Sequence, residues 1–232
     1  AEDIAHDYAL ENKEKFNAEN AALVAIDPKT GGILVMVGSR DYFDTDIDGA
    51  FNVTLAKRQP GSTIKPFVYA EAFRKGYTPE TALFNVKTQF ATKCAGDDLT
   101  SENECYSPEN YDNKFTGPIT MREALAQSVN VPSVKTLYLA GLQDSIRLTR
   151  DMGVESLSVR GDYGLTLVLG GGEVTPLELT SAYGVFANDG MRNAYTPILE
   201  VTSKDSGNLE KLEPKPIQVL EKEIALKISD IL

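Results

Sequence analysis

The sequence predicts an α+β fold in which an antiparallel sheet is flanked by helices. Apolar residues 21–27 and 33–37 are separated by the turn-forming segment Pro28–Gly32, a pattern that indicates a β-hairpin. Both faces of this hairpin are apolar, so we expect helices to cover them. Elsewhere in the chain, helix-start signals precede residues with helical spacing.

The composition is that of an ordinary globular protein. The chain has 232 residues, of which 42% are hydrophobic and 25% charged. This is enough for one large domain or two small ones, and it excludes fibrous and wholly disordered proteins. The net charge of -11 disfavours a nucleic-acid partner, because phosphates would repel the chain. The apolar runs fall far short of the ~20 residues that a membrane helix needs.

Residues 1–20 are predicted to form a linker helix that leads in from an upstream domain. Ile4, Tyr8 and Phe16 lie at multiples of four and give a modest amphipathic stripe. The charged segment after Ala1 does not have the pattern of a signal peptide. His6 is the only histidine, and we interpret it as structural, which excludes a Ser-His-Asp triad.

The middle of the chain alternates between a helix and irregular segments. After the acidic stretch over residues 41–48, Arg58–Phe67 leads into a predicted helix over 68–75, which Gly76 ends. Residues 78–117 are predicted to be irregular. The acidic stretch is interpreted as a solvated surface, with a weak calcium site as the alternative.

Two capping boxes predict helix starts in the second half of the chain. The first, over 120–123, opens a helix through residue 128, and another helix is expected from Pro132. The second, over 175–178, opens a helix through residue 187 and follows a predicted turn at Gly170–Gly172. Isoleucines at the helical spacing within 224–231 predict a last helix.

Ser62 and Lys65 have the spacing of an acyl-transfer nucleophile and its base. Side chains three residues apart share one face of a helix. A serine hydroxyl needs a base to take its proton, and a lysine can be that base when burial lowers its pKa. The alternative is a serine helix cap followed by a surface lysine. The apolar segment Phe67–Ala70 favours the nucleophile, because a surface lysine needs no apolar setting.

Ser128 and Asn130 are candidates for a proton relay and a peptide-binding amide. The Ser-x-Asn pattern starts at Ser101, Ser128 and Ser206, so the pattern alone carries little information. Only the pattern at Ser128 lies between apolar residues at a helix break, whereas the other two lie in polar loops. The alternative is that Ser128 and Asn130 only satisfy the end of a helix.

Cys94 and Cys105 lie in a polar stretch without a second cysteine pair or a nearby histidine. The sequence therefore predicts no zinc site at these cysteines. We expect no other metal site and no cofactor. A disulfide that closes this loop would indicate an oxidising compartment, and two free thiols are the alternative.

From about Ala21 to its last residue, the chain resembles the transpeptidase domain of class A penicillin-binding proteins. The resemblance rests on several matches in the same order rather than on one motif. These matches are Ile26–Gly32 with Met36–Gly38, Arg58–Phe67, Pro108–Tyr111, Arg122–Pro132, and Leu169–Gly170 with Val174–Leu179. It implies a β-lactamase/transpeptidase-like fold with a mostly helical subdomain over residues 21–232.

Carried over position by position, the resemblance implies a peptidoglycan D,D-transpeptidase that β-lactams acylate. Ser62 would attack the penultimate D-alanine carbonyl of a stem peptide, and Lys65 would take its proton. Ser128 would pass a proton to the leaving D-alanine, and Asn130 would bind the stem peptide or a β-lactam. The alternatives are a D,D-carboxypeptidase or β-lactamase-like hydrolase, and a catalytically silent β-lactam sensor or scaffold fragment.

The resemblance also implies a place outside the cytoplasm, with membrane contact only through an N-terminal anchor. In one respect the chain departs from the family. The third family motif, Lys-Thr/Ser-Gly, belongs on a late strand beside the site, whereas the only Lys-Thr-Gly here is Lys29–Gly31 in the predicted hairpin turn. We therefore expect a C-terminally incomplete domain whose remaining strands are truncated or lie in a second chain.

Overall fold

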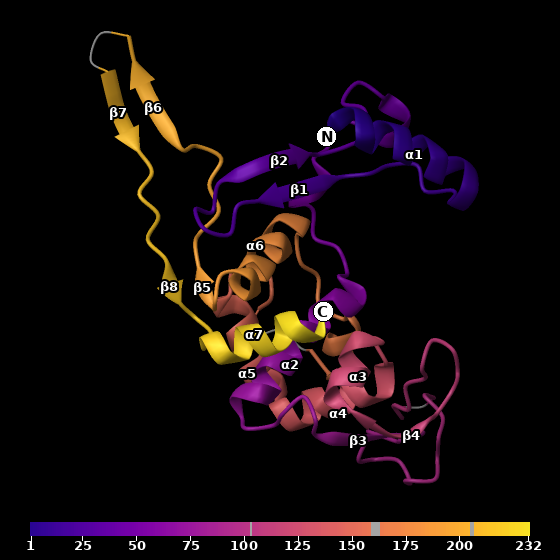
Figure 1. The fold of residues 1–232 in the computed structure, drawn as a ribbon. Helices are drawn as coiled ribbons and strands as arrows, with labels where there is room; N and C mark the ends of the chain where they lie inside the picture. Colours follow the sequence, from indigo (N-terminus) through magenta and orange to yellow (C-terminus); the bar gives the residue numbers. More distant parts are fainter. Residues whose placement is uncertain (103, 159–162, 205–206) are drawn as a thin grey trace. The chain divides into compact units, whose positions relative to one another are not determined.

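The computed structural model describes residues 1–102, 104–158, 163–204 and 207–232. Seven α-helices and four antiparallel two-stranded sheets lie within these ranges, so the predicted α+β class is confirmed (Figure 1). The chain divides into two compact units. The first contains Ala1–Arg58, Arg150–Leu157 and Glu173–Lys222, and the second contains Gln59–Thr149, Ser158–Gly172 and Glu223–Leu232. None of the described helices is long and apolar enough to cross a membrane.

The first unit is built around the predicted hairpin. Its elements are α1 (Glu2–Phe16), β1 (Leu23–Ile26), β2 (Ile33–Val37), η1 (Thr45–Ile47), η2 (Val53–Leu55), α6 (Pro176–Ala187), β5 (Met191–Arg192), β6 (Glu200–Ser203), β7 (Gly207–Lys211) and β8 (Ile217–Gln218). β1 pairs with β2, with Leu23 opposite Val37, and α6 packs against β1 as Figure 1 shows. The predicted capping box at Thr175 and Glu178 opens α6. Helix α1 belongs to this unit, and its role as a linker stays a prediction.

The hairpin turn is fixed by side-chain hydrogen bonds to Asp27. Its carboxylate accepts from the Lys29 N–H and the Thr30 hydroxyl, each at 2.9 Å. Gly31 has φ +76°, and a Cβ there would lie 2.1 Å from the Ala194 carbonyl oxygen. The Lys-Thr-Gly sequence is therefore explained by the turn, because the glycine meets both a backbone and a packing requirement.

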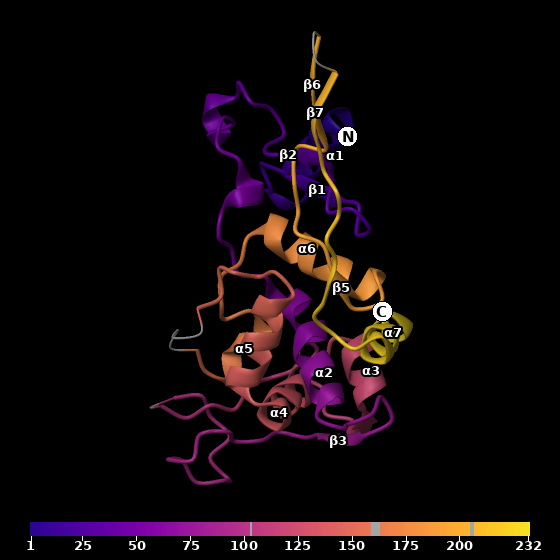
Figure 2. The ribbon, with the colours of Figure 1, turned by 90° about the vertical axis from the view of Figure 1, so that its left-hand side faces the viewer.

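The second unit is mostly helical. Its elements are η3 (Gly61–Ile64), α2 (Lys65–Arg74), β3 (Ala82–Asn85), β4 (Gly117–Thr120), α3 (Met121–Ala126), α4 (Asn130–Ala140), most of α5 (Leu142–Asp151), η4 (Leu165–Leu169) and most of α7 (Lys222–Ile231). Helix α2 packs against α3 and α4 (Figure 2). Phe67, Tyr69 and Leu137 are fully buried. This apolar core holds the start of α2 in place.

Several boundaries differ from the predicted ones. Helix α2 starts at Lys65 rather than at residue 68, and α4 starts at Asn130 rather than at Pro132. Strands β3 and β4 begin in the region that was predicted to be irregular, and α5 was not predicted. The buried residues of α5 include Ser145 and Thr149, so apolar residues alone do not mark the buried face of this helix.

The β1–β2 pair is a two-stranded sheet within the described residues. The only additional backbone pairing described beside it is a parallel bridge between Gly32 and Thr196. Two-stranded sheets are marginal in water without further packing, which here comes from α6. The expectation that further strands extend this sheet stays a prediction.

Candidate active site

Ser62 and Lys65 lie in one continuous turn where η3 runs into α2. The Lys65 N–H donates to the Ser62 carbonyl, which is a 3₁₀ bond. In a 3₁₀ turn the side chains at i and i+3 are eclipsed, so these two side chains lie on the same face. Ser62 is exposed, whereas Lys65 is only 1% exposed. An accessible hydroxyl thus stands one turn before a buried amine.

The Lys65 amine is held by three acceptors, two on Ser128 between α3 and α4 and one on Asn130 at the start of α4. Nζ donates to the Ser128 carbonyl oxygen at 2.7 Å, to Ser128 Oγ at 3.2 Å and to Asn130 Oδ1 at 2.9 Å. None of these described hydrogen bonds goes to the Ser62 hydroxyl. The structure therefore joins Lys65, Ser128 and Asn130 directly, and it places Ser62 beside them through the shared turn.

Burial lowers the pKa of the Lys65 ammonium to about 8. Desolvation is the cause, because a buried ammonium loses its hydration. A neutral amine has two protons and one lone pair. The Ser128 carbonyl and Asn130 Oδ1 can only accept, so they take the two protons, and the lone pair is left to face a hydroxyl. The arrangement can therefore move a proton between Lys65 and a serine.

Ser128 has an unusual backbone for a serine. Its φ is +55°, in the left-handed region, where it follows the last turn of α3. The Ser128 N–H donates to the Leu125 carbonyl, and the Val129 N–H donates to the Ala124 carbonyl, which together form a Schellman ending. Glycine is the usual residue at this position because it adopts that φ without strain. The backbone alone therefore does not account for a serine here.

Asn130 begins α4, and its amide is oriented by a neighbouring loop. Its Nδ2 donates to the Glu109 carbonyl oxygen at 3.0 Å, which turns Oδ1 toward Lys65. Because a carbonyl oxygen can only accept, this contact fixes which end of the amide faces the amine. Glu109 lies in the match Pro108–Tyr111, for which the sequence alone offered no role.

Gly170 ends the η4 turn against the residue before Ser62. Its φ is +96°, and a Cβ at this position would lie 2.4 Å from the backbone N of Gly61. Any larger residue would displace the turn that carries Ser62. The predicted turn at Gly170–Gly172 therefore contributes to the place of the candidate nucleophile.

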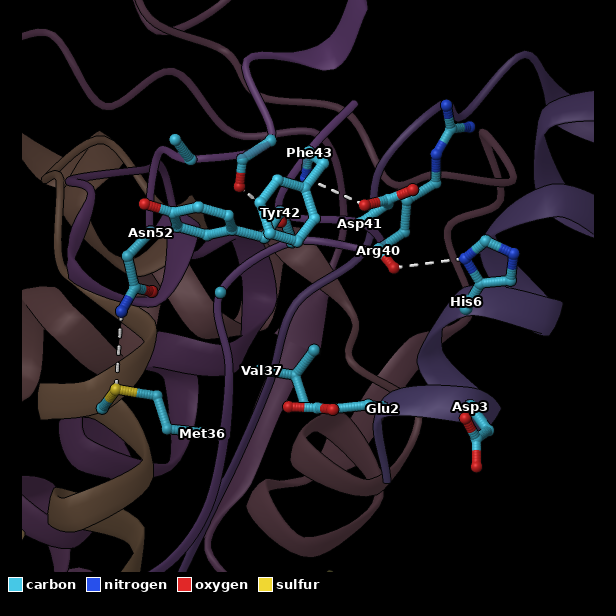
Figure 3. A pocket seen from close by; sticks show the side chains of 14 residues that line it. Glu2, Asp3, His6, Met36, Val37, Arg40, Asp41, Tyr42, Phe43 and Asn52 are labelled. Carbon is cyan, nitrogen blue, oxygen red and sulfur yellow. Dashed lines mark hydrogen bonds between the residues drawn. The ribbon is translucent and has the colours of Figure 1, made fainter. Parts of the chain in front are cut away.

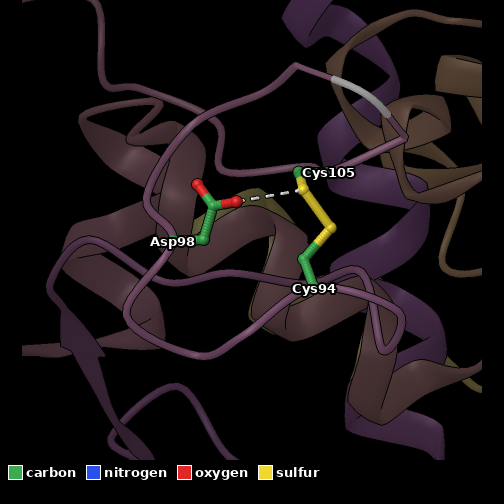
Figure 4. A group of neighbouring side chains, drawn as sticks. All are labelled: Cys94, Asp98 and Cys105. Carbon is green, nitrogen blue, oxygen red and sulfur yellow. Dashed lines mark hydrogen bonds between the residues drawn. A yellow bond between two sulfur atoms is a disulfide. The ribbon is translucent and has the colours of Figure 1, made fainter.

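Cys94 and Cys105 form a disulfide with a Cα–Cα distance of 5.8 Å (Figure 4). Asp98 Oδ2 lies 3.4 Å from Cys105 Sγ. A disulfide sulfur carries no proton, so this contact is not a hydrogen bond. It also carries no thiolate charge, so the sulfur is not a metal ligand. These three residues therefore do not form a metal site while the disulfide is intact.

His6 belongs to the first unit, whereas the residues described above belong to the second. It lines a cavity of about 480 Å³ with Arg40 and Tyr42 (Figure 3). Its Nδ1 stands 3.2 Å from the Arg40 carbonyl oxygen. This backbone contact agrees with a structural role. Ser206 and Asn103, which belong to the other two Ser-x-Asn patterns, lie outside the described residues.

The penicillin binding protein transpeptidase domain family matches residues 21–232. The chain belongs to this family. The resemblance to class A penicillin-binding proteins that the sequence motifs indicated is thereby confirmed.

Two curated relatives cover most of this transpeptidase domain. Penicillin-binding protein 2D of Bacillus subtilis (strain 168) is 35% identical over 202 residues, which are 87% of this chain and 27% of the relative. Penicillin-binding protein 1A of Neisseria meningitidis serogroup A is 34% identical over 193 residues, which are 83% of this chain and 23% of the relative. The chain therefore spans about a quarter of the length of these relatives.

Two solved structures share the fold of this transpeptidase domain. Penicillin-binding protein 1A from Haemophilus influenzae aligns with a TM-score of 0.79 and 24% identity, over 92% of this chain and 34% of that chain. The PonA1 protein from Mycobacterium tuberculosis, solved in complex with penicillin V, aligns with a TM-score of 0.77 and 19% identity, over 98% of this chain and 59% of that chain.

Proposed function

We propose that this chain carries the serine acyl-transfer site of a peptidoglycan D,D-transpeptidase. The observation that carries the proposal is the buried Lys65 amine, one turn after the exposed Ser62 and bonded to both Ser128 and Asn130. A lysine with a pKa of about 8 is a competent general base near neutral pH. Membership of the penicillin-binding transpeptidase family supports the same chemistry.

In the first half-reaction, Ser62 Oγ attacks the carbonyl carbon of the penultimate D-alanine in a stem peptide. The neutral Lys65 amine accepts the hydroxyl proton as the new C–O bond forms. The C–N bond to the terminal D-alanine then breaks, and its nitrogen takes a proton that passes from Lys65 through the Ser128 hydroxyl. An ester between Ser62 and the donor peptide remains, together with free D-alanine.

In the second half-reaction, an amine of a neighbouring stem peptide attacks the ester. The proton lost by that amine returns to Ser62 Oγ, which restores the serine and completes the cross-link. Asn130 would hold the donor peptide through the part of its amide that Glu109 and Lys65 leave free. A β-lactam would open on Ser62 by the first half-reaction alone.

The disulfide supports a place outside the cytoplasm. Disulfides persist in oxidising compartments, and Cys94 and Cys105 are joined in the structure. The partners that we propose are peptidoglycan stem peptides and β-lactams, and the net charge of -11 weighs against nucleic acid. Attachment to the membrane would use an anchor upstream of this chain.

Covalent labelling with a fluorescent penicillin tests the proposal. We expect a labelled band that survives denaturing electrophoresis, with the adduct mapped to the peptide that contains Ser62. The band should be lost in Ser62→Ala, while Ser39→Ala, a serine of the first unit, should be labelled normally. An adduct mapped to another residue, or no adduct on the full-length protein, would refute the nucleophile and favour the silent scaffold.

The role of Lys65 needs its own variants. Lys65→Ala should slow acylation by about 10² to 10⁴-fold, the range for loss of a general base. Lys135→Ala is the matched control, because burial also lowers the pKa of Lys135 while its Nζ donates to the Phe84 carbonyl instead. An equal loss of rate in both variants would refute the base assignment.

Product analysis separates the transpeptidase from its hydrolytic alternatives. The protein is incubated with a donor stem peptide and an acceptor amine, and the products are identified by mass spectrometry. A transpeptidase gives the cross-linked product, whereas a D,D-carboxypeptidase gives only the shortened donor and D-alanine. Rapid turnover of the penicillin adduct would instead indicate a β-lactamase.

A further inference from the structure

Helix α4 begins at Asn130 and has no side-chain cap from its N-cap residue. Its N-cap residue is Val129, whose side chain offers no hydrogen-bond acceptor. The first N–H groups of a helix have no partner within the helix and need an acceptor from elsewhere. Asn110, which precedes Val131 by twenty-one residues, supplies this acceptor. Its Oδ1 accepts from the Val131 N–H at 3.0 Å. A distant loop therefore caps this helix.

Asn110 is itself held by a buried polar network. It is 4% exposed, and its Nδ2 donates to Asn85 Oδ1 and to the Lys114 carbonyl oxygen, both at 2.7 Å. Asn85, on β3, is 2% exposed, and its Nδ2 donates to Thr116 Oγ1 at 3.1 Å. Both amide protons and the amide oxygen of Asn110 are thus used. Buried polar groups with every partner satisfied fix a single arrangement.

The network ends at the candidate base. Because Asn110 attaches its loop to the first turn of α4, the carbonyl of the preceding residue, Glu109, meets the Asn130 amide. That carbonyl orients Asn130 so that Oδ1 accepts from Lys65 Nζ. The contacts form one chain from Asn85 through Asn110 and Asn130 to Lys65.

We propose that Asn110 is a positioning residue for acylation, acting on Lys65 through Asn130. This inference rests on the proposed function of the site. Asn110 touches neither Ser62 nor Lys65 in the described contacts, so its effect must pass through the orientation of the Asn130 amide. Loss of the Asn110 side chain frees this amide, and Lys65 loses a fixed acceptor for its ammonium form.

A double-mutant cycle with penicillin acylation tests this inference. Asn110→Ala should lower the acylation rate constant by about 10-fold, since displacement of a reacting group by even ~1 Å can cost more than that. In the Asn130→Ala background the same substitution should have little further effect, because residues that act through one another are not additive. An equal fold-loss in both backgrounds would overturn the proposal.

The pH profile of acylation provides the second measurement. With its acceptor no longer oriented, the Lys65 ammonium is less stabilised, so the midpoint of the rise in rate with pH should move to lower pH in Asn110→Ala. A purely structural Asn110 would lower the amount of folded protein without moving this midpoint. Titration of the Lys65 side chain by NMR gives the same readout without activity, and an unchanged Lys65 pKa would overturn the proposal.

A matched control separates this role from general destabilisation. Asn193 is also a buried asparagine, 9% exposed, and its Nδ2 donates to the carbonyl oxygens of Pro28 and Lys29 in the first unit. Asn193→Ala should leave the acylation rate of the folded protein unchanged. Should Asn110→Ala fail to fold, Asn85→Ala is the second variant, because it removes the acceptor of Asn110 Nδ2. It should move the midpoint of the pH profile in the same direction by a smaller amount.

The outcomes separate this inference from the proposed function. If the wild-type chain is acylated on Ser62 and Asn110→Ala behaves like the wild type, only the positioning role fails. If the wild-type chain is not acylated, the proposed function fails. In that case the Lys65 titration still decides whether Asn110 acts on the amine.

Discussion

The backbone of Gly170 lies directly against that of Gly61. A Cβ at Gly170 would stand 2.4 Å from Gly61 N and 2.5 Å from its Cα, closer than any real Cβ contact. Backbone atoms cannot rotate away as the end of a flexible side chain can. Because Gly61 directly precedes Ser62, the close backbone contact with Gly170 fixes the position of the candidate nucleophile.

Gly170→Ala should therefore slow penicillin acylation by about 10-fold or more, since small displacements of reacting groups have effects of that size. Gly76→Ala is the matched control: its φ is +98°, close to the +96° of Gly170, but no atom lies within 4 Å of its Cβ position. Both variants place an alanine at nearly the same positive φ, and only one has the clash. Equal acylation rates in the two folded variants would contradict the role of Gly170.

A buried hydroxyl pair links α2 to α4. Ser133 Oγ donates its one proton to the Val129 carbonyl, so the Tyr69 hydroxyl must donate to Ser133 at 3.1 Å. Burial raises the pKa of Tyr69 to about 12, so the hydroxyl keeps its proton. Tyr69→Phe should lower the free energy of unfolding by about 1 kcal/mol, the usual net value of one hydrogen bond.

Denaturant unfolding measures this loss, and Tyr138→Phe provides the comparison. Tyr138 lies on α4, the helix of Ser133, but it is 73% exposed, so removal of its hydroxyl should leave stability nearly unchanged. If Tyr69→Phe proves as stable as Tyr138→Phe, the hydroxyl pair contributes nothing to the packing of α2 on α4.

The lowered pKa of Lys65 makes stability depend on pH. Its folded pKa of about 8 lies below the ordinary value of 10.5, so the unfolded chain binds more protons between these values. Stability should therefore rise with pH across that window, by at most about 1.4 kcal/mol per pH unit from this group. Below pH 8 both states are protonated, and the buried ammonium destabilises the folded chain.

Lys65→Met removes the charge but keeps most of the volume. It should be more stable than the wild type at pH 7, and its advantage should shrink between pH 8 and 10.5. Urea unfolding of both proteins at a series of pH values gives this difference directly. A constant difference across the whole range would mean that the Lys65 pKa is the same in the folded and unfolded states.

The disulfide between Cys94 and Cys105 can be tested by counting free thiols. Under denaturing conditions, a thiol reagent should find no free cysteine in the untreated protein and two after reduction, because Cys94 and Cys105 are paired. Joining two residues that lie eleven apart restricts the unfolded chain, so reduction should lower stability by about 2 to 4 kcal/mol. Two thiols without reductant would contradict the pairing.

Local signals predicted much of the fold. The hairpin follows from two apolar runs around a Pro/Gly turn, and the capping boxes at Thr120 and Thr175 follow from spacing within four residues. Strands β3 and β4 were missed because β3 buries the polar Asn85 and exposes Phe84, and because β4 contains Pro118, an unusual residue in a strand. Their pairing depends on residues far apart in the chain.

The candidate site also has a part that the sequence predicts and a part that only the structure shows. The three-residue spacing of Ser62 and Lys65 is local, and the structure adds that Lys65 is buried against Ser128 and Asn130. The roles of Asn110 and Gly170 could not be assigned from the sequence. Asn110 contacts Val131, more than twenty positions away, and Gly170 contacts Gly61, more than one hundred positions away. Only the folded chain creates these contacts. An asparagine or a glycine in a loop carries no mark of such a contact.

The acylation rate measured against pH tests the central claim most directly, namely that a buried Lys65 amine activates Ser62. The second-order rate constant for a penicillin should rise with pH around a midpoint near 8, and NMR titration of Lys65 should give the same value. In Lys65→Ala the rise should disappear. A pH-independent rate in the wild type, or a Lys65 pKa at the ordinary value of 10.5, would contradict the account.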